Sequence, residues 1–286
     1  MKENNKLSSM NLNYTDSTTN FSTAETFHEN TKQWNYEQQI SKIKTQGKTD
    51  YVKRLILNQN LHNTSELTKI IAQDTDKYKG FTSIPLNNKI KDQSNNLINI
   101  ITERKSVRKF TGNSLDVQEL TTLLYSYKTT TKIERTDIYR RTIPSGGALY
   151  PVELYLTLPT NIDKEIIKGT YYYNSNKHSL VIINNKPRLK EVRKFLFQPD
   201  LQINKSAAIF YITGILNKSS WKYGDRAYRY MLLEAGHLAQ NLLLITTSLN
   251  LGSCPIGGFN DNMVNDYLYL DSINEVTLYI IIIGKI

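Results

Sequence analysis

The sequence has a single cysteine, Cys254, in 286 residues, so no disulfide can form within the chain. This fits a reducing compartment. Residues 1–20 lack the apolar core of a secretory signal. The most apolar run, Val276 to Ile283, is much shorter than the roughly 20 residues that cross a bilayer. We therefore expect a soluble, cytoplasmic protein with no transmembrane segment.

The chain also lacks the features of a nucleic-acid-binding protein. Its formal net charge is +10, but the Lys and Arg residues are scattered among Asn and Thr. No dense basic block or nucleic-acid-binding motif is present. A solvated basic surface, which would attract an acidic partner or peptide, is the simpler interpretation. No nucleic-acid partner is expected.

The composition changes along the chain and predicts its organisation. Residues 1–35 are rich in Asn, Thr, Ser and charged side chains, which predicts a disordered tail. Residues 36–94 carry imperfect apolar stripes and are expected to form a helical extension. Residues 95–286 mix helical and strand patterns in one domain. This predicts an α+β fold in which helices flank a central, mainly antiparallel sheet.

Within that domain, apolar periodicity predicts the individual elements. Helices are expected at 96–104, 115–127 with Ser114 as the N-cap, 188–197 and 228–249. Strands are expected at 152–158, 207–213 and 276–283, with a hairpin at 169–183. Residues 128–142 look irregular. The helix at 228–249 is apolar almost all round, so we expect it to be buried or to lie in a subunit interface.

The stretch Pro144-Ser145-Gly146-Gly147-Ala148-Leu149-Tyr150-Pro151 leads directly into the strand predicted at 152–158. Two adjacent glycines allow positive φ angles and a close approach by another group. Val152, Leu154, Leu156 and Leu158 fall on one face of a half-buried strand. Taken alone, this pattern is also that of an ordinary hairpin corner.

Two further motifs indicate a ligand. The basic stretch Arg104-Lys105-Ser106-Val107-Arg108 ends a predicted helix, where it would clamp a phosphate. A second Gly-Gly loop, at 254–259, closes the long apolar helix. Together these motifs suit a flat, phosphorylated ligand, because backbone N–H groups left bare by glycine reach ring heteroatoms. From the residues alone, a solvated basic patch is the simpler interpretation of the stretch at 104–108.

The segments PSGGALYPVELYL, EAGHLAQNLLL and CPIGGF resemble the nitroreductase-like FMN enzymes, and among them the SagB-type dehydrogenases. These enzymes oxidise azolines to azoles in peptides such as the streptolysin S-like cytolysins. The resemblance runs from about residue 27 to the C-terminus. It implies a nitroreductase-like FMN-binding fold, a homodimer, a precursor peptide substrate and a YcaO-type cyclodehydratase complex as partner.

The resemblance also implies a set of FMN-binding residues. The loop at 145–147 would come from the partner subunit, and backbone N–H groups at 255–258 would lie beside the flavin N5 and O4. Lys105 stands where the family usually has a second Arg, so a bidentate contact is lost. Lys285 aligns with a phosphate-binding Arg, although an ordinary C-terminal lysine fits equally well. The implied cofactor residues are Arg104, Lys105, Ser106, Arg108, Pro144, Ser145, Gly146, Gly147, Pro255, Ile256, Gly257, Gly258 and Lys285.

Lys222 and Tyr223 are by composition only a polar turn before a helix. The resemblance implies that they are the catalytic pair of a peptide azoline oxidase. Aromatising a thiazoline or oxazoline removes a hydride, which the flavin takes, and a proton from the neighbouring ring carbon. Tyr223 activated by the lysine, or Lys222 itself, would take the proton. The sequence does not decide between the two.

Two other features have simpler interpretations. Cys254 has no adjacent base and is expected to be structural. Glu234 and His237 have Glu-x-x-His spacing, but no second copy of the motif is present. We therefore expect a satisfied buried polar pair and no metal.

The predicted function is FMN-dependent dehydrogenation of thiazoline or oxazoline rings in a ribosomally made peptide. One alternative is an NAD(P)H-dependent nitroreductase or flavin reductase on the same fold. The other is a non-catalytic scaffold that holds a synthetase complex together.

Overall fold

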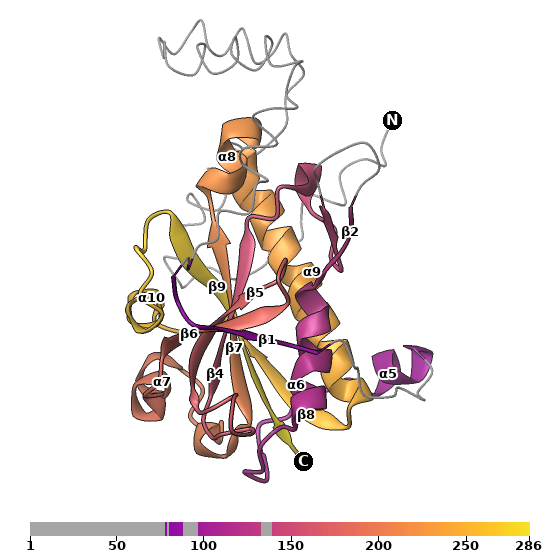
Figure 1. Cartoon of the computed structure of the whole chain (residues 1–286), viewed down its shortest axis with the longest axis vertical. Coiled ribbons are helices and arrows are strands. Elements are labelled where there is room, and N and C mark those ends of the chain that lie inside the picture. The colour runs from indigo at the N-terminus through magenta and orange to yellow at the C-terminus, as the bar shows by residue number, and fades with distance from the viewer. Residues whose placement is uncertain (1–77, 79, 88–96, 133–138) are drawn as a thin grey trace, which may run out of the picture.

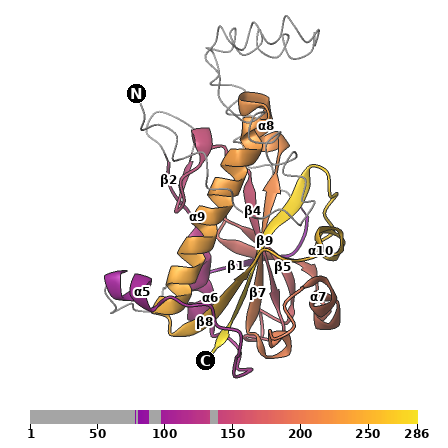
Figure 2. The same ribbon diagram turned by 180° about the vertical axis from the view of Figure 1, so that it is seen from behind.

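The computed structural model describes residues 78, 80–87, 97–132 and 139–286 (Figures 1 and 2). The tail predicted at 1–35 and most of the extension predicted at 36–94 lie outside these residues. Of the extension, the described part includes strand β1 (Ser83–Pro85), which pairs with the main sheet.

The core of the fold is a seven-stranded sheet with the order β1-β6-β5-β4-β7-β9-β8. Every neighbouring pair is antiparallel. The predicted strands and hairpin are confirmed, and so is the α+β class with its antiparallel sheet. The strands besides β1 are β4 (Val152–Leu158), β5 (Gly169–Asn174), β6 (Ser179–Asn184), β7 (Ala208–Ile215), β8 (Leu251–Ile256) and β9 (Glu275–Lys285).

Helices cover both faces of the sheet (Figure 1). Helices α6 (Val117–Leu124) and α9 (Arg226–Ser248) pack on one face, and α7 (Leu189–Phe195) and α10 (Asp261–Tyr267) on the other. All seven residues of β4 are therefore buried. The prediction of a half-buried strand at 152–158 is wrong, because β4 is central and both of its faces are covered. The predicted alternation of its side chains is confirmed. Leu154 and Leu156 belong to the hydrophobic core under α6 and α9, and Tyr155 belongs to the core under α7 and α10.

The helix predicted from Ser114 begins later than expected. Asp116 is the N-cap of α6, and it forms a capping box with Glu119. The Asp116 carboxylate accepts from the Glu119 N–H at 2.7 Å, and the Glu119 carboxylate accepts from the Asp116 N–H at 2.8 Å. The α-helix ends at Leu124 and continues as a 3₁₀ turn, η2 (Tyr125–Tyr127). Two backbone donors are satisfied at once, which explains why Asp116 replaces Ser114 as the cap.

The region at 128–142, predicted to be irregular, contains two short strands. β2 (Thr129–Lys132) and β3 (Tyr139–Arg141) form a separate antiparallel pair. Short helices α5 (Leu97–Glu103) and α8 (Asn217–Tyr223) complete the described elements that bear on the site. α5 and α7 lie close to their predicted positions.

Helix α9 is buried on one side only. Met231, Leu238 and Leu242 face the sheet, whereas Leu232 and Leu233 are 41% and 56% exposed. Of the two predicted alternatives, burial within the chain is therefore wrong, and a subunit interface stays a prediction. Among the described residues, no helix combines the length and the apolar character needed to cross a bilayer.

The basic segment at 104–110 is docked on the sheet by glycines. A Cβ added to Gly284 would lie 2.7 Å from ring atoms of Phe110, so we expect Gly284→Ala to lower the free energy of unfolding by roughly 1–3 kcal/mol. Gly236→Ala is the matched control, because nothing lies within 4 Å of its added Cβ. Because alanine has a higher helix propensity than glycine, the free energy of unfolding of this control should rise by up to about 1 kcal/mol. Urea unfolding measures both; equal loss in the two variants would contradict the docking.

Candidate active site

The loop between Ser145 and Val152 has an unusual backbone. Gly147 adopts φ +64°, and Ala148 and Tyr150 have φ +54° and +47°. Left-handed conformations cost non-glycine residues energy, and they persist where surrounding contacts impose them. Here the Ser145 hydroxyl accepts a hydrogen bond from the Tyr150 N–H at 2.9 Å, and the Ala148 N–H donates to the Ser145 carbonyl at 3.1 Å. The loop is thus held in one shape by its own hydrogen bonds.

The pairing of β4 with β7 places this loop beside helix α8. Val152, at the start of β4, lies opposite Gly214, near the end of β7. The Ile215 N–H donates to the Pro151 carbonyl at 2.8 Å, and α8 begins two residues later. Because the strands are antiparallel, the segment before β4 and the segment after β7 meet at the same end of the sheet.

Lys222 and Tyr223 lie in the last turn of α8 and reach back to the loop. A Cβ at Gly147 would be 2.6 Å from the Tyr223 hydroxyl and 2.8 Å from the Lys222 Nζ. Both polar atoms therefore face the bare Cα of Gly147, where no other residue type would leave room. The structure thus brings together two of the motifs singled out in the sequence.

Tyr230 is a third aromatic residue at this place, and the sequence analysis missed it. It lies in the second turn of α9, and its ring meets the Tyr223 ring edge-on at 4.9 Å and 87°. Its Cδ2 is 3.4 Å from the position of a Cβ on Gly146. Burial, and Tyr230 as a neighbouring phenol, raise the pKa of Tyr223 above its usual value. The only sequence signal was an ordinary aromatic residue in a helix.

The position of α8 is fixed by a buried carboxylate. Lys218 of α8 forms an ion pair with Glu153 of β4, whose side chain is 3% exposed. The other Glu153 oxygen accepts from the Tyr172 hydroxyl at 3.0 Å. The Trp221 indole N–H donates to the Lys218 carbonyl at 3.0 Å within the helix. The catalytic pair predicted at 222–223 therefore stands on a helix tied to the centre of the sheet.

Helix α9 ties down the other side of the loop through Glu234. This side chain is buried, and its carboxylate accepts from the Val152 N–H at 3.4 Å. Burial is the main cause that raises the Glu234 pKa to about 7. The predicted buried pair with His237 is wrong, because the His237 side chain is exposed.

The basic segment lies along β8. The Val107 N–H donates to the Ser253 carbonyl at 2.7 Å, and Ser106 forms a bridge with Ser253. The side chains of Lys105, Ser106 and Arg108 are exposed, and Arg104 is half-buried. They are accessible to an anionic ligand. Cys254 is buried, and this raises its pKa although the nearby Arg108 lowers it, so the structure offers no reactive thiolate there.

Lys285 ends β9 opposite Leu251, close to the basic segment. Its Nζ lies 3.2 Å from Glu119 Oε2, in an ion pair whose carboxylate is 6% exposed. The same carboxylate caps α6. Lys285 is thus already paired with a carboxylate of its own chain. Its contact with a phosphate stays a prediction.

The second Gly-Gly pair follows a strand, not the long helix as predicted. Pro255 and Ile256 end β8, and Gly257 and Gly258 come directly after it. Nothing lies within 4 Å of a Cβ placed on Gly257, so its backbone faces open space. The Gly258 carbonyl accepts from the Phe197 N–H at 3.3 Å. This bare backbone is suited to a flat ligand.

The predicted cofactor residues do not all meet within one chain. The loop with Gly147 lies at the end of the sheet where β4 and β9 begin, since Val152, Gly214 and Val276 are aligned. Lys285 is at the opposite end of β9. Val276 and Lys285 are nine positions apart along the strand, which corresponds to about 30 Å. Figure 1 shows the same separation, with α8 at one end and the C-terminus at the other.

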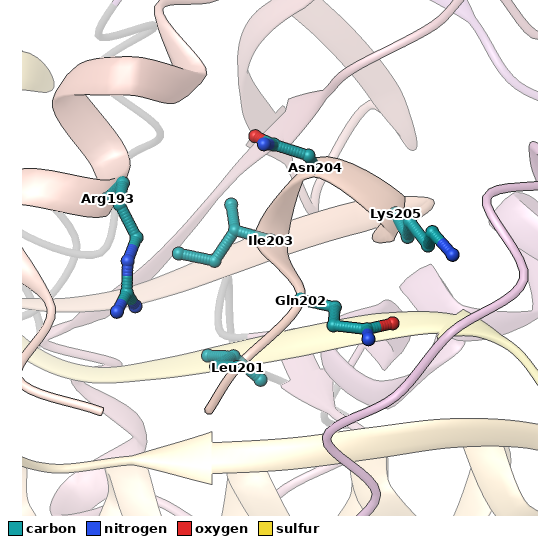
Figure 3. A pocket seen from close by; sticks show the side chains of 6 residues that line it. All are labelled: Arg193, Leu201, Gln202, Ile203, Asn204 and Lys205. Atoms are coloured by element: carbon teal, nitrogen blue, oxygen red, sulfur yellow. The ribbon is translucent and has the colours of Figure 1, made fainter. Parts of the chain in front are cut away.

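A pocket lies near the basic segment, and none of the predicted catalytic or cofactor-binding residues lines it (Figure 3). Arg193 of α7 and residues 201–205, which include η4 (Ile203–Lys205), form its walls. The Arg193 guanidinium donates to the carbonyls of Gln198 and Pro199, and it therefore holds the loop after α7 in place. The Gln202 N–H donates to the Arg108 carbonyl at 3.1 Å, which joins this loop to the basic segment.

Comparison with known proteins identifies relatives. The model of the nitroreductase family matches residues 101–285. The nitroreductase-like protein MJ1384 of Methanocaldococcus jannaschii is 31% identical over 189 residues, which are 66% of this chain and 90% of that protein. The microcin B17-processing protein McbC of Escherichia coli is 27% identical over 51% of this chain and 55% of its own length. The trifolitoxin-processing protein TfxB of Rhizobium leguminosarum bv. trifolii is 27% identical over 58% and 47%. The chain thus spans about half the length of the two processing proteins.

Solved structures share the fold. A nitroreductase-like protein from Anabaena variabilis aligns with a TM-score of 0.57 and 26% identity, over 72% of this chain and 39% of that one. The Escherichia coli microcin synthetase McbBCD complex with truncated pro-MccB17 bound contains a chain that aligns with a TM-score of 0.54 and 22% identity, over 74% and 81%. With the family model covering the whole main domain, the chain belongs to the nitroreductase family.

Proposed function

We propose that this protein is an FMN-dependent oxidase that converts thiazoline or oxazoline rings to thiazoles or oxazoles in a ribosomally made peptide. The observation that carries the proposal is that Lys222 and Tyr223 meet at the bare face of Gly147. Membership of the nitroreductase family supports a flavin. Similarity to the microcin B17- and trifolitoxin-processing proteins supports a peptide substrate.

The residues present fit FMN. The exposed side chains of Lys105, Ser106 and Arg108 suit a phosphate, and the open backbone at Gly257 suits a flat ring. Arg104, Pro255, Ile256, Gly258 and Lys285 flank these groups, and Pro144, Ser145 and Gly146 flank Gly147. When bound, FMN supplies an acceptor for the hydride.

Removal of the ring proton falls to Lys222 or Tyr223. The raised pKa of Tyr223 favours its neutral phenol, which donates a hydrogen bond more readily than it accepts a proton. We therefore favour Lys222, which accepts a proton only as the neutral amine, as the base, and Tyr223 as the group that orients the ring. The Tyr223 and Tyr230 rings, set edge to face, offer apolar surfaces against which a five-membered heterocycle can pack.

We further propose that the functional unit is a homodimer. The predicted phosphate-binding residues, at 104–108 and Lys285, lie at the opposite end of the sheet from the loop at 144–147, so a second copy is needed to complete a site. An apolar surface is available for it on α5 and α9, where Leu97, Ile98, Leu232 and Leu233 are 59%, 65%, 41% and 56% exposed. A groove between α5, α6 and α9, lined by Leu97, Ile100, Tyr125 and Ile245 among others, adjoins the exposed side chains of α5.

The chemistry also defines the partners. An azoline must form by cyclodehydration before it can be oxidised, so we propose that a YcaO-type cyclodehydratase complex supplies the modified precursor peptide. The fold similarity to a chain of the microcin synthetase complex is compatible with such an assembly. An NAD(P)H-dependent reductase remains the second candidate, because MJ1384 matches over most of its length.

The first prediction concerns the reaction. The protein incubated with FMN and a thiazoline-bearing peptide should remove about 2 Da per ring, detected by mass spectrometry. Lys222→Ala should slow this reaction by roughly 10²–10⁴-fold, and Tyr223→Phe should also slow it. Both variants should retain FMN, and Lys186→Ala, at an exposed lysine, should react like the wild type.

The outcomes separate the candidate functions. FMN binding and NAD(P)H consumption without mass loss would favour the reductase. Failure to take up FMN, with assembly of the synthetase complex intact, would favour the scaffold.

The second prediction concerns the anchor of α8. Lys218→Met leaves the Glu153 carboxylate buried without its ammonium partner. We expect a loss of roughly 1–3 kcal/mol in stability, moderated because Lys218 is 27% exposed. Ring oxidation should fall further than FMN content does, since α8 carries the catalytic pair. The double variant Glu153→Gln/Lys218→Met should regain most of the stability; no recovery would argue against an electrostatic anchor.

The third prediction concerns the dimer. Leu233→Glu places a charge in the proposed interface, so light scattering should show dissociation to monomers, and FMN affinity should fall with it. Ile273→Glu is the control, because Ile273 is 80% exposed and lies in the loop between α10 and β9. A wild-type monomer that binds FMN fully would refute the homodimer.

A further inference from the structure

The side chain of Arg141, the last residue of β3, reaches the start of β4. Its Nη1 donates a hydrogen bond to the hydroxyl of Tyr127, and that hydroxyl donates to the Val152 carbonyl. The Tyr127 side chain is fully buried. One phenol therefore connects Arg141 to the residue at which β4 begins and the loop that contains Gly147 ends.

Arg141 also contacts Tyr150, which lies within that loop. The Arg141 backbone N–H donates to the Tyr150 hydroxyl at 2.9 Å. The guanidinium carbon lies 4.6 Å from the centroid of the Tyr127 ring and 4.8 Å from the centroid of the Tyr150 ring, within the range of cation–π attraction. The backbone of Arg141 thus holds the hydroxyl of Tyr150, and the guanidinium holds its ring.

The backbone of Tyr150 helps to determine the shape of the loop. It has φ +47°, a conformation that a tyrosine keeps where surrounding contacts impose it. Its N–H donates to the Ser145 hydroxyl at 2.9 Å, which closes the loop around Gly147. Because a Cβ on Gly147 would lie 2.6 Å from the Tyr223 hydroxyl, a shift of the loop by about 1 Å would misplace the predicted catalytic pair.

The charge of Arg141 supports the same arrangement. Arg141 interacts electrostatically with Glu153 and Glu234, two buried carboxylates. Glu153 pairs with Lys218 of α8, and Glu234 of α9 accepts from the Val152 N–H at 3.4 Å. The loop, α8 and α9 are therefore each linked to one cation on β3.

We propose that Arg141 is a positioning residue of the candidate active site, which holds the loop that contains Gly147 against Lys222 and Tyr223. It acts through Tyr127 and Tyr150. The inference rests on the proposed function, because it takes Lys222 and Tyr223 to carry the reaction. It does not depend on where FMN binds.

The test compares three variants with two matched controls. Arg141→Gln removes the cation, Arg141→Lys keeps a charge and a donor, and Tyr150→Phe removes the hydroxyl that accepts from the Arg141 N–H. Arg140→Gln makes the first change at the exposed neighbouring position. Tyr267→Phe removes a buried hydroxyl in the core under α7 and α10, on the other face of the sheet.

The first measurement is amide hydrogen exchange in the peptide that covers residues 145–151, which needs neither cofactor nor substrate. The N–H groups of Ala148 and Tyr150 are hydrogen-bonded within the loop, so their exchange reports its opening. Relative to a peptide from β7, Arg141→Gln should accelerate this exchange about tenfold or more. Tyr150→Phe should accelerate it less, and the controls should not. Unchanged exchange in folded Arg141→Gln, or in Tyr150→Phe if Arg141→Gln does not fold, would overturn the inference and leave the proposed function intact.

The second measurement is the kinetics of ring oxidation. We expect kcat of Arg141→Gln to fall by roughly 10–10²-fold, with the peptide KM nearly unchanged, and Arg141→Lys to recover part of the loss. An increase in KM without a change in kcat would show that Arg141 binds the peptide instead, and an equal fall in kcat for Tyr267→Phe would show an effect of stability alone. Either result would overturn the inference. If the wild type oxidises no ring, the proposed function fails, and hydrogen exchange still decides whether Arg141 holds the loop.

Discussion

The candidate site depends on one steric constraint, the absence of a side chain at Gly147. The Tyr223 hydroxyl and the Lys222 Nζ occupy the space that a Cβ on Gly147 would fill, and the positive φ of Gly147 disfavours any replacement. The constraint works only because β4 and β7 are antiparallel neighbours. Their pairing brings the segment before one strand against the segment after the other, so the sheet defines which residues meet.

Buried carboxylates near the start of β4 also hold α8 and the loop that contains Gly147 in position. Glu153 holds α8 through Lys218, and Glu234 holds the loop from α9. Buried carboxylates are costly unless they are paired or hydrogen-bonded, and replacing such pairs by apolar residues is often neutral for stability. Their presence beside the loop and α8 is therefore better explained by the need to orient these two segments than by the stability of the fold.

The sequence predicted the sheet well, because the strands are continuous or alternating apolar runs bounded by turn residues. It predicted the helix α6 but misplaced its N-cap at Ser114, although the Asp116-x-x-Glu119 capping box was present in the sequence. It failed at β2, where a run of threonines gives no apolar alternation. The family resemblance singled out Lys222, Tyr223 and the loop that contains Gly147. It did not predict that these residues meet where β4 pairs with β7. Tyr230, Lys218 and Glu153 were missed because each is a single polar or aromatic residue within a regular pattern.

The separation of the predicted cofactor residues also bears on how the protein would be controlled. The groups suited to a phosphate lie near the C-terminal end of β9, and the groups suited to proton transfer lie about 30 Å away at its start. If two copies of the chain complete each site, neither cofactor binding nor proton transfer can be complete in a monomer. Association of the chains then becomes a precondition of activity, and the apolar surface on α5 and α9 would matter to catalysis as directly as Lys222 does.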